Sequence, residues 1–314
     1  MLNICLVGEG AQGATYMEAL QSVDGMQVVA LVGGVAEDVA GFAEKWQIPR
    51  QGTDLQLALD EGVDAVILGS PSRLHRQQAE QVLKAGKHLL LEIPMALSLQ
   101  HSEELTNIAR NTDRVAMVAH TRRFAPVWKE LQRQVMDGEL TPLHLVTQTY
   151  FFRRENLNRF GQPRTWVDNM LWHHGCHFLD FICTLFPGDS FEVWAQAGPE
   201  HPELGIPMDL TLGMRSKDGA LVSSVCSFNH HGPIQASCKV IGLENTLEVG
   251  GPKLVDYQGN ILMQQNPLDP FINILAEFRD AIVQQRQPES CFAQCLEAMR
   301  LIDRLQRCID GAAS

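Results

Sequence analysis

The string Gly8-Glu9-Gly10-Ala11-Gln12-Gly13 constrains the fold of this chain more than any other feature of its sequence. It directly follows an apolar run, residues 2–7, that has the pattern of a buried strand. In a strand–turn–helix unit, the first glycine permits the tight turn, the second lets the backbone approach a pyrophosphate, and the third allows close packing. The phosphates then lie at the helix N-terminus, where free amides attract anions. The string therefore predicts a dinucleotide site formed by Gly8, Gly10, Ala11, Gln12 and Gly13.

Apolar runs and amphipathic stretches alternate over about the first 120 residues. Thr53-Asp54 and Ser98 are predicted N-caps of two of the intervening helices. Nearly continuous apolar strands that alternate with helices indicate a parallel sheet covered on both faces. We therefore predict a Rossmann domain over residues 1–121, with strands at 2–7, 28–32, 65–68, 88–93 and 115–119 and helices that include 54–61 and 76–85.

The pattern changes after residue 121, where a helix at 126–138 is followed by long runs of alternating polarity. Lys217-Asp218-Gly219 is typical of a hairpin turn between two of these runs. We predict a C-terminal α/β domain, residues 122–314, with a large, mostly antiparallel sheet that is open on one face. A last helix, about residues 270–308, is expected to pack back on the N-terminal domain. The predicted strands are 143–152, 191–198, 208–215, 220–228, 235–241 and 246–249.

The charge and the apolar runs exclude several classes of partner. The net charge of -12 argues against nucleic acid and against an anionic membrane surface. No apolar run is long enough to cross a bilayer, and the N-terminus lacks the pattern of a signal peptide. The 8 cysteines form no CxxC pair, which favours reduced core cysteines. We expect a cytoplasmic protein.

Ligands of open α/β sheets bind beyond the carboxyl ends of the strands. Each segment that follows a predicted strand carries polar or turn residues, and although any one could be a plain turn, together they predict a cofactor crevice. The candidates are Gly33, Gly34, Ser70, Pro71, His75, Glu92, Ile93, Pro94 and Thr121.

The segment Val32-Gly33-Gly34 bears on the choice of cofactor. NAD enzymes usually place an acidic residue after the second strand, where it bonds the ribose 2′-hydroxyl, whereas NADP enzymes place an arginine there. This segment has neither. The missing acid favours NADP, with NAD as the alternative.

Several of these motifs occur together in one known family. The glycine string, Ser70-Pro71 with His75, residues 85–94 and Arg122-Arg123-Phe124 resemble the Gfo/Idh/MocA oxidoreductases. The resemblance covers essentially the whole chain. It implies a Rossmann domain followed by a domain with a large open sheet, and an NAD(P)-dependent dehydrogenase. Because the family often dimerises through that open face, a homodimer or homotetramer is expected.

Longer strings, mostly in the C-terminal domain, are similar to those of a family member that acts on a small dicarboxylate semialdehyde. Ile93 stands where most members have a proton-transferring lysine, and His173 stands where an aspartate is common. Both departures argue against an ordinary sugar or cyclitol dehydrogenase, the main alternative. A non-catalytic dinucleotide-binding sensor is the other alternative. The strings are residues 120–124, 148–154, 163–166, 171–174 and 201–206, together with His177 and Asp180.

Histidine is the first candidate for a base because its pKa lies near working pH. The resemblance makes His177 the base, with His173 beside it as a partner or substrate ligand. The two are four residues apart and share a face if the segment is helical. His174 points elsewhere and is either structural or a substrate contact. A His-x-x-x-His pair can bind zinc, but no acidic third ligand of the zincin type is evident, so no metal is predicted.

Arginines gather around these histidines in a chain that is otherwise acidic. Guanidinium binds carboxylate in a bidentate manner, so the arginines, with a nearby tryptophan, are predicted to bind the substrate. One or two of them are expected to form surface or interdomain salt bridges instead. The candidates are Arg122, Arg123, Arg153, Arg154, Arg164 and Trp166.

Overall fold

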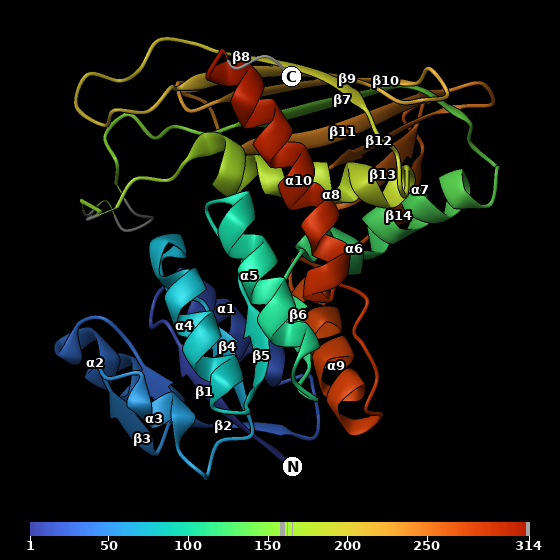
Figure 1. Ribbon diagram of the computed structural model, residues 1–314. Helices are drawn as coiled ribbons and strands as arrows, with labels where there is room; N and C mark the ends of the chain where they lie inside the picture. Colours follow the sequence, from blue (N-terminus) through green and yellow to red (C-terminus); the bar gives the residue numbers. More distant parts are fainter. Residues whose placement is uncertain (158–160, 162, 165, 312–314) are drawn as a thin grey trace. The chain divides into compact units, whose positions relative to one another are not determined.

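The computed structural model describes residues 1–157, 161, 163–164 and 166–311 (Figure 1). Thr165, which belongs to the string 163–166, lies outside the described residues. The chain forms two compact units. The first comprises Met1–Phe124 and Leu268–Leu296, and the second comprises Ala125–Pro267 and Glu297–Ser314.

The first unit is built on a six-stranded parallel sheet in the order β3-β2-β1-β4-β5-β6. This is the order of the doubly wound dinucleotide-binding fold and confirms the predicted Rossmann sheet. The three-residue β3 is too short to show a pattern, and the sequence did not predict it. The strands are β1 (Leu2–Val7), β2 (Met26–Val32), β3 (Arg50–Gly52), β4 (Ala65–Leu68), β5 (His88–Leu91) and β6 (Ala116–Val118).

Helices cover this sheet, and α4 and α5 lie side by side (Figure 1). Ser98 caps α5 by accepting a hydrogen bond from the His101 amide at 3.2 Å, which confirms the predicted cap. Asp54 accepts from the Gln56 amide at the start of α3, at 2.9 Å. The helices are α1 (Ala11–Leu20), α2 (Ala36–Trp46), α3 (Gln56–Leu59), α4 (Ser72–Lys84), α5 (Leu99–Arg110), α6 (Thr121–Phe124) and α9 (Asp269–Val283).

The predicted last helix at 270–308 is wrong as a single element. It is two helices, α9 and α10 (Phe292–Ile309). Between them Gln285 takes a left-handed conformation with φ 53°, and Pro288 supplies no amide for a helical hydrogen bond. Helix α9 packs against α1 and α6 within the first unit, and the division between the units falls inside α10.

The second unit holds an eight-stranded sheet in the order β14-β13-β12-β11-β7-β10-β9-β8. Only the β10–β7 pair is parallel, which confirms a large, mostly antiparallel sheet, and the predicted hairpin joins β9 to β10. The short strands β13 and β14 were not predicted. The strands are β7 (Pro142–Tyr150), β8 (Glu192–Ala197), β9 (Asp209–Arg215), β10 (Leu221–Ser227), β11 (Gln235–Gly242), β12 (Thr246–Gly250), β13 (Lys253–Asp256) and β14 (Ile261–Gln264).

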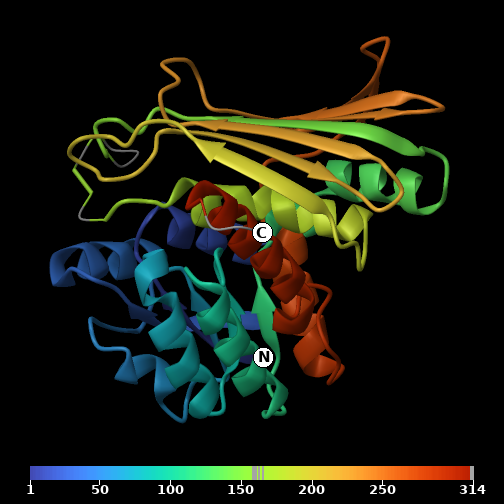
Figure 2. The same ribbon diagram turned by 45° about the horizontal axis from the view of Figure 1, so that its top comes forward.

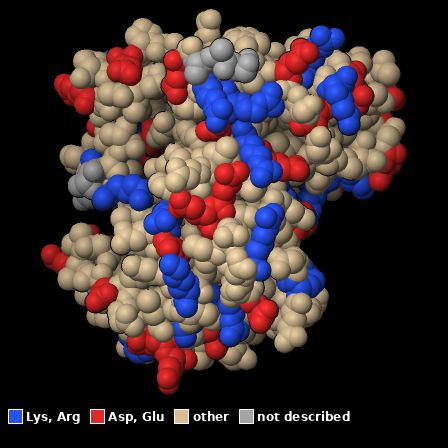
Figure 3. Space-filling view, viewed as in Figure 1, with Lys and Arg blue, Asp and Glu red and all other residues tan. Residues whose placement is uncertain are grey.

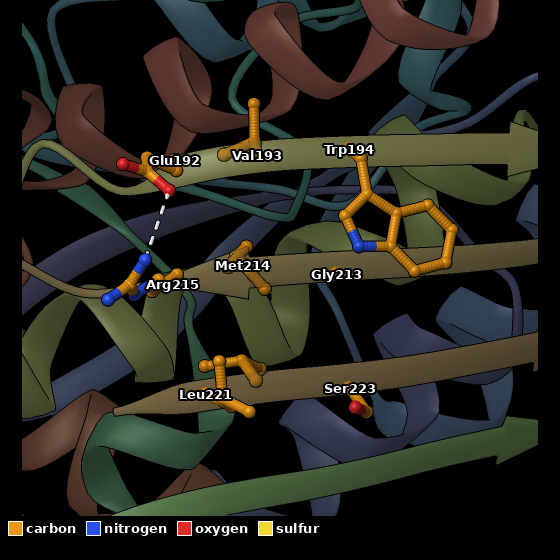
Figure 4. A pocket seen from close by; sticks show the side chains of 9 residues that line it. Glu192, Val193, Trp194, Gly213, Met214, Arg215, Leu221 and Ser223 are labelled. Atoms are coloured by element: carbon orange, nitrogen blue, oxygen red, sulfur yellow. Dashed lines mark ion pairs between the residues drawn. The ribbon is translucent and has the colours of Figure 1, made fainter. Parts of the chain in front are cut away.

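One face of this sheet is covered by α7 (Pro126–Met136) and α8 (Cys176–Leu185), and Figure 2 shows no described helix on the other face. The open face carries large apolar side chains, among them Trp194 at 53% exposure. A hollow of about 350 Å³ lies on this face. Figure 4 shows the residues that line it, with the Trp194 indole over Gly213. Arg215 pairs with Glu192 in the same hollow. None of the predicted site residues lines it.

The surface carries both signs of charge. On the face shown in Figure 3, many Lys and Arg side chains lie beside Asp or Glu. Among the ion pairs of the first unit, Arg76 contacts both Glu80 and Glu104. No helix in the described part of the chain combines the length and hydropathy needed to cross a membrane. All 8 cysteines are thiols, and all but Cys308 are buried.

Candidate active site

The glycine loop after β1 has the geometry that pyrophosphate binding requires. Gly8 has φ +119°, and a Cβ on it would lie 2.7 Å from the Gly69 carbonyl oxygen. A Cβ on Gly13 would lie 2.1 Å from the Gly8 oxygen, so only glycine lets α1 pack this closely. Gly10 is exposed at the N-cap of α1, with open space where its Cβ would be. The free helix N-terminus and the open space fit a dinucleotide pyrophosphate.

A carboxylate that the glycine string did not predict lies at the end of β2. Glu9 Oε1 accepts hydrogen bonds from the amides of Gly34 at 2.8 Å and Val35 at 3.3 Å. A Cβ on Gly33 would lie 2.4 Å from Glu9 Oε2. The segment after β2 has no acidic residue, which favours NADP, yet Glu9 reaches this edge from the neighbouring loop.

Glu92, after β5, is anchored to α1. Its Oε1 accepts from Gln12 Nε2 at 2.7 Å and from the Tyr16 hydroxyl at 2.5 Å, and its Oε2 accepts from the Ile93 amide. Burial raises the pKa of Glu92, and burial followed by the Glu92 charge raises that of Tyr16 well above its usual range. The network ties the glycine-loop helix to the Glu92-Ile93-Pro94 turn.

His75 is buried and contacts backbone oxygens. Its Nδ1 lies 2.7 Å from the Pro94 oxygen and its Nε2 lies 2.8 Å from the Ser70 oxygen. It therefore joins the turns that follow β4 and β5. His75 was predicted to bind the cofactor, and in the structure it holds these two turns together.

Helix α6 carries Thr121 with Arg122 and Arg123, which places these residues in the first unit. The Arg123 guanidinium is buried and donates to the Glu289 carbonyl oxygen at 3.1 Å and to Gln294 Oε1 at 3.4 Å. These contacts join α6 to the segment that precedes α10 and to the first turn of α10 itself. Arg123 therefore serves the packing of its own unit.

The histidines lie where a π-helix, η1 (Met170–Gly175), passes into α8. The Asn169 side chain caps η1 by accepting from the Trp172 amide at 3.0 Å. His173 and His174 belong to the π-turn, and the half-buried His177 lies in the first turn of α8. Single π-turns are frequent at functional sites.

Arg164 is held by its own unit. It donates to Asp168 Oδ2 at 2.5 Å and to Asn156 Oδ1 at 2.8 and 3.1 Å, and its guanidinium lies 5.6 Å from the Trp166 ring centre. The side chains of Arg164 and Asp168 are only 9% and 5% exposed. The Asp168 carboxylate balances the charge of Arg164, and these contacts fix the guanidinium in place.

Both histidines of the π-turn are driven toward the neutral form. His174 packs against the rings of Phe151 and Phe228, and burial and then the charge on His173 lower its pKa well below the usual value. Burial also lowers the pKa of His173, with Asp168 acting in the opposite direction. His173 Nδ1 is buried without a hydrogen-bond partner among the described residues. Neutral imidazole is the form that accepts a proton.

Two adjacent arginines differ in their surroundings. Arg153 lies over the Phe151 ring at 5.3 Å and donates to the Phe152 oxygen, and its Nε has no partner among the described residues. Burial lowers the pKa of Arg153, and its charge in turn lowers the pKa of His173 and His174. Arg154 is exposed and donates to Asn229. The second unit thus brings Arg153, Arg164, His173 and His174 together and leaves Arg154 aside.

An acidic residue does lie beside the histidines. Ligand atoms of Asp168, His173 and His174 lie within 4.8 Å of one another. The sequence shows no acidic third ligand of the zincin type, but the folded segment places Asp168 beside both histidines. Arg164 nevertheless occupies the Asp168 carboxylate and disfavours a cation there, so the absence of a metal stays a prediction.

The comparisons with known proteins agree with this arrangement. Residues 2–120 match the Gfo/Idh/MocA model, described as an oxidoreductase family with an NAD-binding Rossmann fold, and residues 126–263 match a C-terminal domain of bacterial oxidoreductases. The chain belongs to the Gfo/Idh/MocA family. It is therefore a dehydrogenase that uses a nicotinamide dinucleotide.

Named relatives of this Gfo/Idh/MocA enzyme include a 4-carboxy-2-hydroxymuconate-6-semialdehyde dehydrogenase from a Sphingobium species. The two are 36% identical over 97% of this chain and 98% of that protein. A trans-1,2-dihydrobenzene-1,2-diol dehydrogenase from Xenopus tropicalis is 28% identical over 71% of this chain and 68% of its own length. Among solved structures, a levoglucosan dehydrogenase complex has a TM-score of 0.87 at 16% identity, covering 99% of this chain and 97% of that one.

Ile93 differs from the residue that most members of the family have at this position. This side chain is 6% exposed and follows the anchored Glu92 directly. The resemblance implies a lysine here in most members, and an apolar side chain can neither donate nor accept a proton. Ile93 itself can take no part in proton transfer, and the histidines of η1 and α8 stay the predicted candidates for it.

Proposed function

We propose that this enzyme oxidises the cyclic hemiacetal of 4-carboxy-2-hydroxymuconate-6-semialdehyde to 2-pyrone-4,6-dicarboxylate, within the 4,5-cleavage route of protocatechuate. One observation carries the proposal. Arg153 and Arg164 with Asp168 leave a net charge of one positive beside two histidines whose pKa values are lowered. A dicarboxylate needs such a cation, and a neutral polyol does not. The semialdehyde dehydrogenase relative supports the same substrate class.

The chemistry begins with ring closure, in which the enol oxygen adds to the aldehyde and forms a hemiacetal. A nicotinamide dinucleotide held at the glycine loop would accept the hydride from the hemiacetal carbon. A base takes the hydroxyl proton, and the C–O bond becomes the lactone carbonyl. The balance is hemiacetal plus oxidised cofactor to lactone, reduced cofactor and one proton.

The protein's own groups divide the remaining work. His177 takes the hydroxyl proton, because it is half-buried in the first turn of α8 and matches the family's active-site histidine. His173, held neutral by burial, assists it or contacts the ring. Arg153 binds a substrate carboxylate, while Arg164, with Trp166 against it, holds Asp168 beside the histidines.

The sequence alone favours NADP as the cofactor, with NAD as the alternative. The position of Glu9 at the end of β2 favours NAD instead. Either cofactor supports the oxidation proposed here.

Product identification tests the proposal. The semialdehyde is generated from protocatechuate with a 4,5-dioxygenase, and the reduced cofactor and the product are measured together. The expected result is one pyrone dicarboxylate for each reduced cofactor, with myo-inositol and glucose inactive. Rapid turnover of those polyols without turnover of the semialdehyde would favour a sugar dehydrogenase. A protein that binds the cofactor and turns over none of these substrates would favour a sensor.

We also propose that the enzyme is cytoplasmic and works as a homodimer or homotetramer formed through the open face of the large sheet. Trp194 and Leu221 are 53% and 46% exposed on that face. Burial of such a surface stabilises association. Light scattering should give a mass of two or four chains for the native protein and one for Trp194→Glu, and a native monomer would contradict this.

A further inference from the structure

Glu9 lies in the glycine string, yet its side chain reaches the end of the neighbouring strand β2. Oε1 is fixed by the amides of Gly34 and Val35 at 2.8 and 3.3 Å. Oε2 carries no hydrogen bond from any residue that the structure describes, and it lies 2.4 Å from where a Gly33 Cβ would be. One carboxylate oxygen is therefore held and the other is open to a ligand.

This place corresponds to the ribose position of a Rossmann unit. Strands β1 and β2 are parallel neighbours, and the Gly8 amide donates to the Val32 oxygen at 2.8 Å. The pyrophosphate binds at the start of α1, and the adenosine ribose meets the end of the second strand. The Glu9 carboxylate thus lies where other NAD enzymes place the acidic residue that follows β2.

The surrounding charges disfavour a phosphate. Helix α2 has Glu37 and Asp38 in its first turn, and the sequence holds no Lys or Arg from Gly33 to Glu44. The amides of Gly34 and Val35, which could otherwise hold an anion at the start of α2, already bind Glu9. A 2′-phosphate would displace Glu9 from these amides and lie beside its negative charge, whereas a 2′-hydroxyl would donate to it.

We propose that Glu9 makes this enzyme select NAD over NADP. This rests on the proposed function only in requiring that the chain binds a nicotinamide dinucleotide. Glu9 occupies a variable position of the glycine string. Its carboxylate lies where an acidic residue directly after β2 would lie, and the sequence has no acidic residue there.

The test measures binding without turnover. NADH and NADPH are titrated into the substrate-free protein, and dissociation constants are taken from nicotinamide fluorescence. The variants are Glu9→Gln, which keeps the shape and removes the charge, and Gly34→Arg, which adds a cation where a Cβ has ordinary contact with Glu9 at 3.7 Å. Glu18→Gln, on the exposed face of α1, is the matched control for a general loss of negative charge.

The wild type should bind NADH at least tenfold more tightly than NADPH. Glu9→Gln and Gly34→Arg should each tighten NADPH binding at least tenfold, and Glu18→Gln should leave the ratio within twofold. A wild type that prefers NADPH, or a ratio that neither variant moves, would overturn the role of Glu9 and leave the dehydrogenase assignment intact. Failure of the folded wild type to bind either nucleotide would refute both.

Discussion

Arg153 offers the sharpest test of substrate binding because the adjacent Arg154 is a natural control. Arg153→Met removes a guanidinium that has one hydrogen bond to backbone and an Nε without a partner among the described residues, beside two neutral histidines. Arg154→Met removes the same charge from an exposed side chain that bonds Asn229. Each variant removes one positive charge, but only the Arg153 charge acts on the two histidines.

A hydrogen bond to a charged group contributes about 1.5–3 kcal/mol. Loss of the Arg153–carboxylate contact should therefore raise KM about 10- to 150-fold, at about 1.4 kcal/mol per factor of ten. Initial rates of cofactor reduction against semialdehyde concentration measure this. Arg154→Met should stay within about twofold of wild type, since an exposed pair contributes little.

The same substitution should move the pH profile. The Arg153 charge lowers the pKa of His173 and His174, so its removal raises both. If activity requires neutral His173, the acidic limb of the pH profile should shift to higher pH in Arg153→Met. A KM for Arg153→Met within twofold of that for Arg154→Met, with the acidic limb unmoved, would refute the placement of the substrate carboxylate at Arg153.

Three further results are expected. Asp168→Asn should destabilise the protein by about 3–5 kcal/mol in urea unfolding, because it leaves Arg164 buried and unpaired, and Arg164→Met added to it should restore most of the loss. His177→Asn should lower kcat by about 10²- to 10⁴-fold with an unchanged dissociation constant for NADH; an unaffected kcat would exclude it as the base. Burial, and then the charge of Arg114, lowers the pKa of His88 from 6.5 to about 4 in the folded protein. As the pH falls, the unfolded chain therefore binds a proton at His88 before the folded protein does. Stability should fall as pH drops from about 6.5 to 4, by about 1–2 kcal/mol after allowing for partial exposure, in wild type but not in His88→Asn.

The sequence predicted the frame of the fold because its strongest signals are local. Strands β1 and β4 begin and end where their apolar runs do, since both lie inside a parallel sheet. Strands β13 and β14 are short, lie at one end of the second sheet and are separated by a Gly-Asn turn, so their alternation is weak. The break before α10 depends on Gln285 and Pro288, which the helical periodicity on either side concealed.

The sequence predicted which types of residue gather at the candidate site, but only partly what each of them does there. A motif treats the positions between its glycines as free, so Glu9 was passed over although it lies inside the string. Asp168 follows Arg164 by four residues, but its pairing with that arginine, and with the histidines nearby, requires the folded segment. Nothing in the sequence separates Arg153 from Arg154, because the difference between them is burial.

The central claim is that a hydride leaves the hemiacetal carbon of a dicarboxylate substrate. The most direct measurement uses semialdehyde deuterated at the aldehyde carbon, with the reduced cofactor and the product analysed by mass spectrometry and NMR. The expected result is one deuterium at C4 of the reduced nicotinamide and a pyrone dicarboxylate that carries none. Deuterium retained in the product, or reduced cofactor formed without it, would contradict the claim.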